Sequence, residues 1–173
     1  VCALAVLVGS GLAGCAGDAD GAATPAPSLS APSTPAASPV DEQAALLAQY
    51  RKFWESLTPI SLLPEPERRA ALAQLAVDPA LKSLLAGMRA NDDAGEVFYG
   101  AHVPNPEPVP ISPDGKTALV DDCQDSTGTG LASRSTMEPK TRGVPNNHVN
   151  VTMKKSSDGV WKVAFVAYTK TPC

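Results

Sequence analysis

The sequence predicts an α+β fold, in which N-terminal helices pack on one face of a curved antiparallel sheet and a disordered linker precedes them. Apolar residues recur at helical spacing as far as residue 90, whereas after Asn91 they alternate with polar residues as in strands. The chain closes with two alternating runs around Ser156-Ser157-Asp158-Gly159, a pattern typical of a β-hairpin. Helices that come first and strands that follow indicate an α+β arrangement of layers.

The composition allows one folded domain and argues against a nucleic-acid-binding protein. Of the 173 residues, 43% are hydrophobic, and 14 Lys and Arg against 18 Asp and Glu give a net charge of -4. A nucleic-acid binder needs clustered cations that displace counterions from phosphates. A protein that docks on an anionic membrane through its surface needs a basic patch. We therefore expect no nucleic-acid partner.

Residues 1–14 are expected to be a signal peptide, and Cys15 is expected to carry lipid. Residues 1–12 form an uncharged apolar run that is too short for a transmembrane helix but has the length of a signal-peptide core. Neither a Met nor a basic segment precedes this run, so we expect that the sequence begins within the signal peptide. Leu12-Ala13-Gly14-Cys15 follows and resembles the lipobox of bacterial lipoproteins, in which the cysteine is acylated, as by palmitate, and the chain is cut before it. The alternatives are an ordinary secretory signal with an incidental cysteine, or a buried helix, which the glycines of this stretch disfavour.

Residues 15–40 are expected to form a disordered tether between the lipidated cysteine and the folded domain. Of the 19 residues from 22 to 40, 17 are Ala, Pro, Ser or Thr and none is charged. Such a segment buries too little apolar area to offset its ordering entropy, and its prolines favour an extended conformation. A plain spacer and an O-glycosylated stalk both fit this composition. The folded domain is expected over residues 41–173.

Three helices are predicted at the start of this domain. Ser38 and Pro39 have the residue types of a helix N-terminus, and Thr58-Pro59 is expected to end the helix that they begin. A short second helix should carry Leu72 and Leu75. Asp78-Pro79 is expected to cap a third helix, whose buried face is Leu81, Leu84, Leu85 and Met88. The aromatic cluster of the first helix, which we expect in the core rather than in a cofactor site, is Tyr50, Phe53 and Trp54.

Alternating residues predict an antiparallel meander after the helices. Strands are expected over residues 96–103, 116–123, 131–137, 148–155 and 160–170. The prolines between residues 104 and 110 exclude a central strand there, and residues 124–130 are expected to form a polar turn. In the final hairpin, one face should be shared by Val149, Val151, Met153, Trp161, Val163, Phe165 and Ala167.

Two resemblances follow from this organisation. Helices with an aromatic cluster, then an antiparallel sheet ending in Asp158-Gly159, Trp161 and Val163, resemble the cystatin-like, nuclear-transport-factor-2-like cone. The chain also resembles small secreted actinobacterial lipoproteins, which combine a lipobox, a Pro/Ala/Ser tether, a strand of the type A-x-V-x-D-C-x-D and a closing cysteine. The residues that match are Ala118, Val120, Asp122, Cys123, Asp125 and Cys173. These resemblances imply a fold and an envelope location, and they imply no activity.

Cys123 and Cys173 are expected to form a disulfide. Cys2 lies in the signal peptide and Cys15 carries lipid, which leaves one pair in an oxidising compartment. Metal ligation is the rival interpretation, but neither cysteine has a cysteine or histidine at the spacing of a zinc site.

No catalytic, cofactor-binding or metal-binding residue is predicted. The densest acidic cluster, Asp121, Asp122 and Asp125, lacks the spacing of a calcium loop, so we expect a solvated turn in which Asp122 or Asp125 bonds local amides. His102 and His148 lie far apart on predicted strands, and the sequence has no nucleophile elbow, phosphate-binding loop or dinucleotide-binding motif.

The sequence therefore predicts a lipid-anchored protein on the outer face of the cell membrane, which acts as a non-enzymatic binding or interaction module without a cofactor. Its partner would be an envelope protein or a small apolar ligand. The alternative is a small cavity enzyme of the isomerase or cyclase type. An enzyme would need at least two titratable groups on the concave face. The inward-facing residues that the pattern predicts there are apolar, namely Val149, Val151, Val163 and Phe165.

Overall fold

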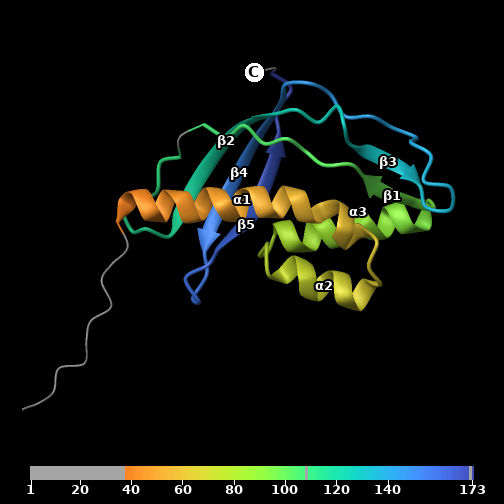
Figure 1. Cartoon of the computed structure of the whole chain (residues 1–173). Coiled ribbons are helices and arrows are strands. Elements are labelled where there is room, and N and C mark those ends of the chain that lie inside the picture. The colour runs from red at the N-terminus through yellow and green to blue at the C-terminus, as the bar shows by residue number, and fades with distance from the viewer. Residues whose placement is uncertain (1–37, 108, 172) are drawn as a thin grey trace, which may run out of the picture. The chain divides into compact units, whose positions relative to one another are not determined.

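The computed structural model describes residues 38–107, 109–171 and 173. The expected signal peptide, Cys15 and the tether up to residue 37 lie outside the described residues. The fold is α+β, as predicted, with helices packed against antiparallel sheets (Figure 1). The helices are α1 (Pro39–Ser61), α2 (Glu65–Ala73) and α3 (Ala80–Asp93). The strands are β1 (Glu96–Tyr99), β2 (Thr117–Gln124), β3 (Gly130–Ser133), β4 (Asn147–Lys155) and β5 (Trp161–Tyr168).

Helix α1 begins where the sequence predicts it. The Ser38 side chain accepts a hydrogen bond from the Asp41 amide, and Pro39 occupies the first turn, where its missing N–H costs nothing. The aromatic cluster Tyr50, Phe53 and Trp54 is completely or almost completely buried, so its predicted place in the core is confirmed.

The end of α1 differs from the prediction. Thr58-Pro59 does not stop the helix, which includes Pro59 and continues to Ser61. Proline removes one hydrogen bond within a helix, and its ring crowds the carbonyl group four residues earlier. Two residues follow Pro59 in the helix. The Ile60 side chain is buried, and the Ser61 hydroxyl donates to the Thr58 carbonyl at 2.7 Å. Core packing therefore outweighs the local effect of the proline.

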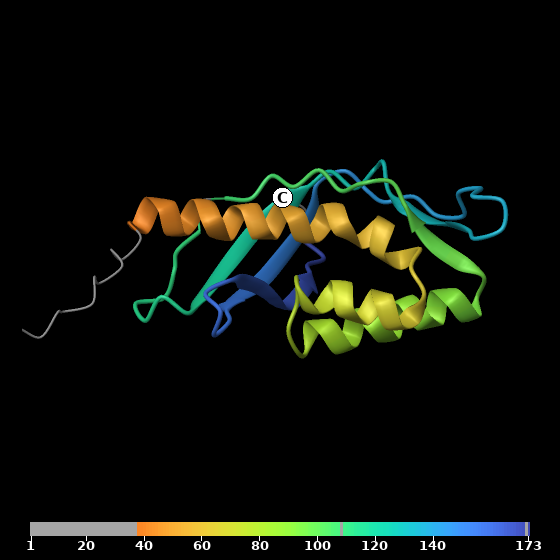
Figure 2. The same cartoon turned by 60° about the horizontal axis from the view of Figure 1, so that its bottom comes forward.

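Helices α2 and α3 pack side by side next to α1 (Figure 2). Leu85 and Met88 are buried as predicted, and Leu81 and Leu84 are partly buried against the same core. The predicted cap of α3 is wrong, because Pro79 holds the cap position and no side chain bonds the first turn.

An ion pair, unpredicted from the sequence, joins α2 to the end of α3. The Arg68 guanidinium is buried and donates to the Asp92 carboxylate at 2.7 Å, while Arg134 approaches the same carboxylate. These hydrogen bonds hold the pKa of Asp92 below its usual value.

The strands form two separate sheets instead of the predicted meander. One sheet has the order β2-β4-β5, and the other pairs β1 with β3. Strand β1 ends at Tyr99, because Gly100 has a positive φ of 73° and a Cβ there would lie 1.9 Å from the Gly128 carbonyl oxygen. The predicted strand through Val103 is therefore broken, and β3 also ends early, at Ser133.

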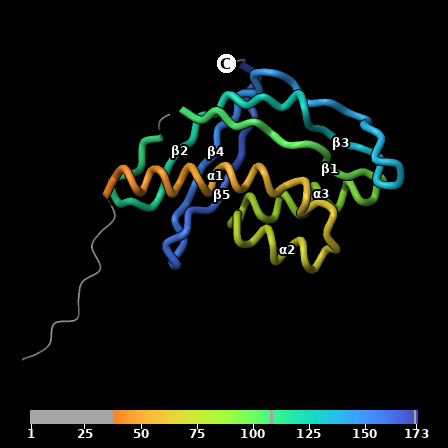
Figure 3. The backbone as a smooth tube through the Cα atoms, viewed as in Figure 1, coloured from red at the N-terminus to blue at the C-terminus, as the bar shows by residue number. Residues whose placement is uncertain are grey.

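The proline-containing segment after β1 runs antiparallel beside β2 (Figure 3), with isolated bridges such as Pro106 to Asp122. It is not a regular strand, as the prolines predict. Gln124 belongs to β2 and is fully buried, so its predicted place in a polar turn is wrong.

The final hairpin has the predicted strands, but Phe165 and Ala167, which follow a bulge, face the other way. The register shifts between Thr152 and Met153, so that Val163 and Ala164 are both buried in succession. This bulge reverses the alternation of β5, and Phe165 is therefore exposed rather than inward-facing.

Cys123 and Cys173 form a disulfide in the structure, with their Cα atoms 5.9 Å apart and a sequence separation of 50. The bond joins the C-terminal residue to β2. Nearby, the ring of His148 contacts the Thr171 carbonyl oxygen at 3.2 Å, so the chain end is held at two points.

Candidate functional site

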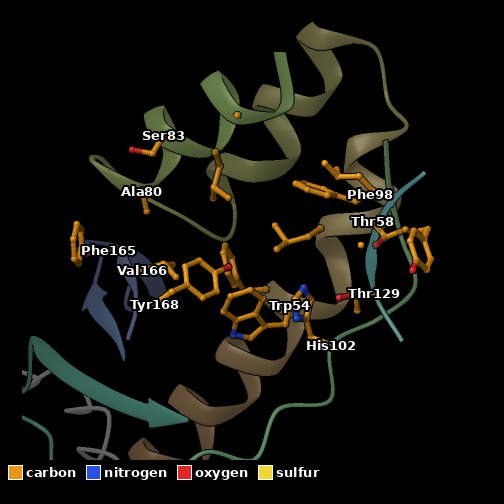
Figure 4. Close-up of a pocket in the computed structure, with 17 residues that line it drawn as sticks. Trp54, Thr58, Ala80, Ser83, Phe98, His102, Thr129, Phe165, Val166 and Tyr168 are labelled. Atoms are coloured by element: carbon orange, nitrogen blue, oxygen red, sulfur yellow. The ribbon is translucent and has the colours of Figure 1, made fainter. Parts of the chain in front are cut away.

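A pocket of about 410 Å³ opens among α1, α3, β5 and the β1-β3 sheet (Figure 4). Trp54 and His102 lie between Phe165, Val166 and Tyr168 of β5 on one side and Phe98 and Thr129 on the other. The lining residues are Phe53, Trp54, Leu57, Thr58, Ala80, Ser83, Leu84, Gly87, Phe98, Tyr99, His102, Thr129, Gly130, Leu131, Phe165, Val166 and Tyr168.

The walls of this pocket are apolar and rich in aromatic rings. Among the residues that the structure describes, no Asp, Glu, Lys or Arg lines it. Phe165 and Tyr168 are 53% and 60% exposed, so these two rings lie where the pocket meets solvent. A lining of this kind suits an uncharged ligand, because a buried charge without a partner is costly.

Three of the hydroxyl groups in the lining are already used within the protein. Thr58 donates to the Gly100 carbonyl at 2.7 Å, Thr129 donates to the Ser126 carbonyl at 2.9 Å, and Tyr99 donates to the Thr141 carbonyl at 2.9 Å. These bonds fix the walls and leave few polar groups for a ligand.

His102 brings an ionisable ring into the pocket. Its ring lies 4.8 Å from the Trp54 ring, between centroids, and its Nδ1 is 3.1 Å from the Ser126 hydroxyl oxygen. Burial lowers the pKa of His102, although the charge of Asp122 and the side chain of Gln124 oppose that shift. At neutral pH the ring is therefore uncharged.

A buried polar cluster stands behind Trp54 and His102. The Tyr50 hydroxyl donates to Asp122 Oδ2 at 2.5 Å and accepts from Gln124 Nε2 at 3.1 Å. The Asn105 amide donates to Asp122 Oδ1 at 2.7 Å. Burial, followed by this contact with Asp122, raises the pKa of Tyr50.

The three acidic residues that the sequence singled out do not converge on one point. Asp125 accepts hydrogen bonds from the amide and hydroxyl of Thr127, as expected for a turn, and these bonds lower its pKa. Asp122 differs from the prediction, because it is fully buried and bonds Tyr50, a residue 72 positions away. Asp121 Oδ1 lies 2.7 Å from Nε2 of His148, outside the pocket.

The two predicted histidines remain apart, since His102 lines the pocket and His148 contacts the chain end. Within the described residues, no group of three or more His, Cys, Asp or Glu side chains could hold a metal ion. None of the helices in the described part is long and apolar enough to span a membrane.

Sequence reasoning missed most of the pocket. It named Trp54, Leu84, His102 and Phe165, but it placed Trp54 and Leu84 in the core, His102 on a strand and Phe165 on an inward face of the sheet, without assigning any of them to this pocket. Gly87 is a pocket residue that the sequence pattern does mark. A glycine inside a helix lowers stability, so its presence there indicates a role other than helix formation. A Cβ at Gly87 would meet no atom within 4 Å, and Gly87 is one of the residues that line the pocket.

Comparison with known proteins supports the fold and no function. No protein-family model matches the chain, and no curated protein matches it either. Among solved structures, the chain is similar to the intermembrane space region of the chloroplast protein ARC6, with 17% sequence identity and a TM-score of 0.55, over 79% of this chain and 100% of that one. A de novo designed β-sheet protein is 16% identical over 78% of this chain and 92% of its own, but its TM-score of 0.30 is too low to support an argument.

At 17% identity, the likeness to the ARC6 region shows the α+β fold alone. Neither of these structures is described as a cystatin-like protein or an actinobacterial lipoprotein, so those resemblances remain predictions.

Proposed function

We propose that this protein is a lipid-anchored binding module of the cell envelope, which takes an uncharged, largely apolar small molecule into the pocket among α1, α3, β1, β3 and β5. The lining of this pocket carries the proposal. Its volume of about 410 Å³ falls within the range of small-molecule sites, and its walls are apolar and aromatic.

The anchor of this module would be lipid on Cys15. The lipobox-like Leu12-Ala13-Gly14-Cys15 and the Ala/Pro/Ser-rich segment that follows it support this part of the proposal. A tether confines the domain to a thin layer at the outer face of the membrane, where apolar molecules concentrate and envelope partners are close.

The second candidate function is a small enzyme of the isomerase or cyclase type, and the position of His102 in the pocket favours it. An uncharged imidazole can act as a general base. A second acid or base is needed as well, and the candidates are Tyr99 and Tyr168. Tyr99 already donates to the Thr141 carbonyl, and Tyr168 lies at the exposed mouth, so the binding module is the better supported function.

The experiment is a fluorescence titration with N-phenyl-1-naphthylamine, an uncharged apolar dye. Wild type is compared with Gly87→Leu, in which the leucine fills space at the α3 wall of the pocket. Leucine also favours a helix more than glycine does, so the variant keeps its fold. Ala86→Leu, at an exposed position of the same helix outside the pocket, is the matched control.

We expect saturable binding by wild type and Ala86→Leu, and at least tenfold weaker binding by Gly87→Leu. Dye taken up by other apolar segments, such as residues 1–12, is common to all three proteins and cancels in the comparison. Equal binding by all three proteins would refute the assignment of the pocket as the ligand site.

A further inference from the structure

Strand β5 is an edge of the three-stranded sheet. The sheet has the order β2-β4-β5, so β4 is its neighbour on one side only. On the other side, the Val163 amide donates to the Leu75 carbonyl at 2.9 Å, and the Val163 carbonyl accepts from the Val77 amide at 2.9 Å. The chain then turns into α3, which begins at Ala80. Beyond Val163, no strand of the described residues pairs with this side of β5.

The register of β5 shows which backbone groups point to that open side. The Thr169 amide donates to the His148 carbonyl of β4 at 3.0 Å. In an antiparallel pair, every second residue exchanges hydrogen bonds with the partner strand, and the residues between point their N–H and C=O groups to the other side. Tyr168 and Val166 therefore face the open side. The outward bonds of Val163 lead to the same result, because the bulge adds one residue between the two stretches.

The N–H and C=O groups of Val166 and Tyr168 accept or donate no hydrogen bond to any other residue that the structure describes. Edge strands are commonly protected from pairing by charged side chains or prolines, and residues 165–168, which read Phe-Val-Ala-Tyr, contain neither. The bulge of β5, which also hinders pairing, lies before these residues. The exposed rings of Phe165 and Tyr168 project to opposite faces of the strand, so an added strand would meet an aromatic ring on each face.

The pocket lies beside this open edge (Figure 4). Val166 and Tyr168 line it from β5, and Ala80 and Ser83 line it from α3, which follows the segment that pairs with Val163 on the open side. In a strand added beside β5, every second side chain would lie on the face of Val166 and Tyr168 and enter the pocket. No Asp, Glu, Lys or Arg of the described residues lines the pocket, so the side chains that suit it are uncharged and apolar.

We infer that the open edge of β5 is a docking strand for a protein partner, which contributes an extended segment whose alternate side chains are apolar and uncharged. The segment adds a strand beside Val166 and Tyr168. The backbone groups of these two residues supply the hydrogen bonds, and the pocket selects the side chains. The inference goes beyond the proposed function, because the backbone of β5 and not the volume of the pocket carries it.

Amide hydrogen exchange of the free, ¹⁵N-labelled chain carrying Cys15→Ala tests the open edge first. The amides of Val166 and Tyr168 should exchange about tenfold faster, or more, than the amide of Ala167, which lies between them and bonds β4. If all three exchange equally slowly, another part of the chain or a second copy of it covers the edge, and the inference is wrong.

Binding is then tested with a synthetic peptide of sequence Thr-Val-Thr-Leu-Thr-Val, capped at both ends, by amide shifts of the same labelled chain. Two N-methylated forms are the matched controls, one methylated on the three threonines and the other on the three apolar residues. Alternate amides of an added strand face β5, and the others face away. One methylated form should therefore bind at least about tenfold more weakly than the other, and the unmethylated peptide should slow exchange at Val166 and Tyr168.

Tyr168→Pro and Tyr168→Val are the matched variants of the protein. Both remove the ring, but only proline removes the outward amide and places ring carbons where the added strand would pair. Proline is tolerated at an edge position whose amide points away from the sheet. We expect Tyr168→Pro to bind the peptide at least about tenfold more weakly than Tyr168→Val does.

Three outcomes besides slow exchange would overturn the inference. The first is equal affinity of the two methylated peptides or of the two Tyr168 variants. The second is no binding of the unmethylated peptide. The third is a dimer that Tyr168→Pro abolishes and Tyr168→Val keeps, which would make a second copy of the chain the occupant. Each of these leaves the proposed function intact, because binding of the dye N-phenyl-1-naphthylamine is measured separately and its failure would count against the proposed function alone.

Discussion

The buried bond between Tyr50 and Asp122 gives the sharpest prediction about stability. Tyr50→Phe removes a single oxygen atom and keeps the ring that packs in the core. That oxygen donates to Asp122 at 2.5 Å and accepts from Gln124 at 3.1 Å, and all three residues have no exposed surface. Water therefore cannot replace the lost partner of either group.

The expected cost follows from these two bonds. A hydrogen bond to a charged group contributes roughly 1.5–3 kcal/mol, and a buried donor left without a partner costs roughly 1–3 kcal/mol. Part of this cost is offset, because folding of the variant no longer requires a hydroxyl group to be moved from water into the core. We expect the free energy of unfolding to fall by about 3 kcal/mol.

The assay is urea unfolding followed by far-ultraviolet circular dichroism, with an unchanged dependence on urea as evidence that the same surface unfolds. Tyr99→Phe is the matched control, because the Tyr99 hydroxyl donates to the Thr141 carbonyl at an exposed position where water can take over. We expect this control to cost less than about 1 kcal/mol. If the two substitutions cost the same, Asp122 is not buried against Tyr50 and the described cluster is wrong.

Three further predictions concern the anchor, the disulfide and His102. Cys15→Ala should move the protein from the membrane pellet to the soluble fraction, and recovery in the pellet at wild-type levels would contradict lipidation. Replacing Cys123 and Cys173 by serine should lower the free energy of unfolding by about 4 kcal/mol, since the bond closes a segment of 50 residues; free alkylation of both thiols in the native protein would show that the bond is absent. Burial lowers the pKa of His102 below its ordinary 6.5, so as the pH falls the unfolded chain binds a proton at His102 before the folded protein does. Wild type should therefore lose stability relative to His102→Phe as the pH falls from 7.5 to 5, and a difference between the two that does not change with pH would show that the ring is not buried.

Much of the fold follows from local patterns in the sequence. The start of α1 and the final hairpin depend on residues close in the chain, and the sequence predicts both. Three departures depend on distant contacts instead. Pro59 stays inside α1 because Ile60 is buried in the core, and Gly100 ends β1 because the Gly128 backbone lies against it. The bulge of β5 at Ala164 sets which side of the strand Phe165 faces, and no local signal marks it.

The candidate site was predictable only in part. The sequence identifies His102 and Trp54 as residues of interest, but their contact joins positions on different elements. Asp122 lies in an acidic run that is typical of a solvated turn, and only the fold brings Tyr50 from 72 residues away to bond it. The disulfide was predictable, because only one cysteine pair is left once Cys2 and Cys15 are assigned to the leader and the lipid.

An amide chemical-shift titration shows whether an apolar molecule binds in the pocket. N-phenyl-1-naphthylamine is added in steps to the ¹⁵N-labelled chain carrying Cys15→Ala. The proposal predicts that the largest shifts cluster at Gly87, His102 and Val166, which line the pocket from α3, from the segment after β1 and from β5. Shifts that cluster instead at Leu119 and Thr152, outside this pocket on β2 and β4, would contradict it.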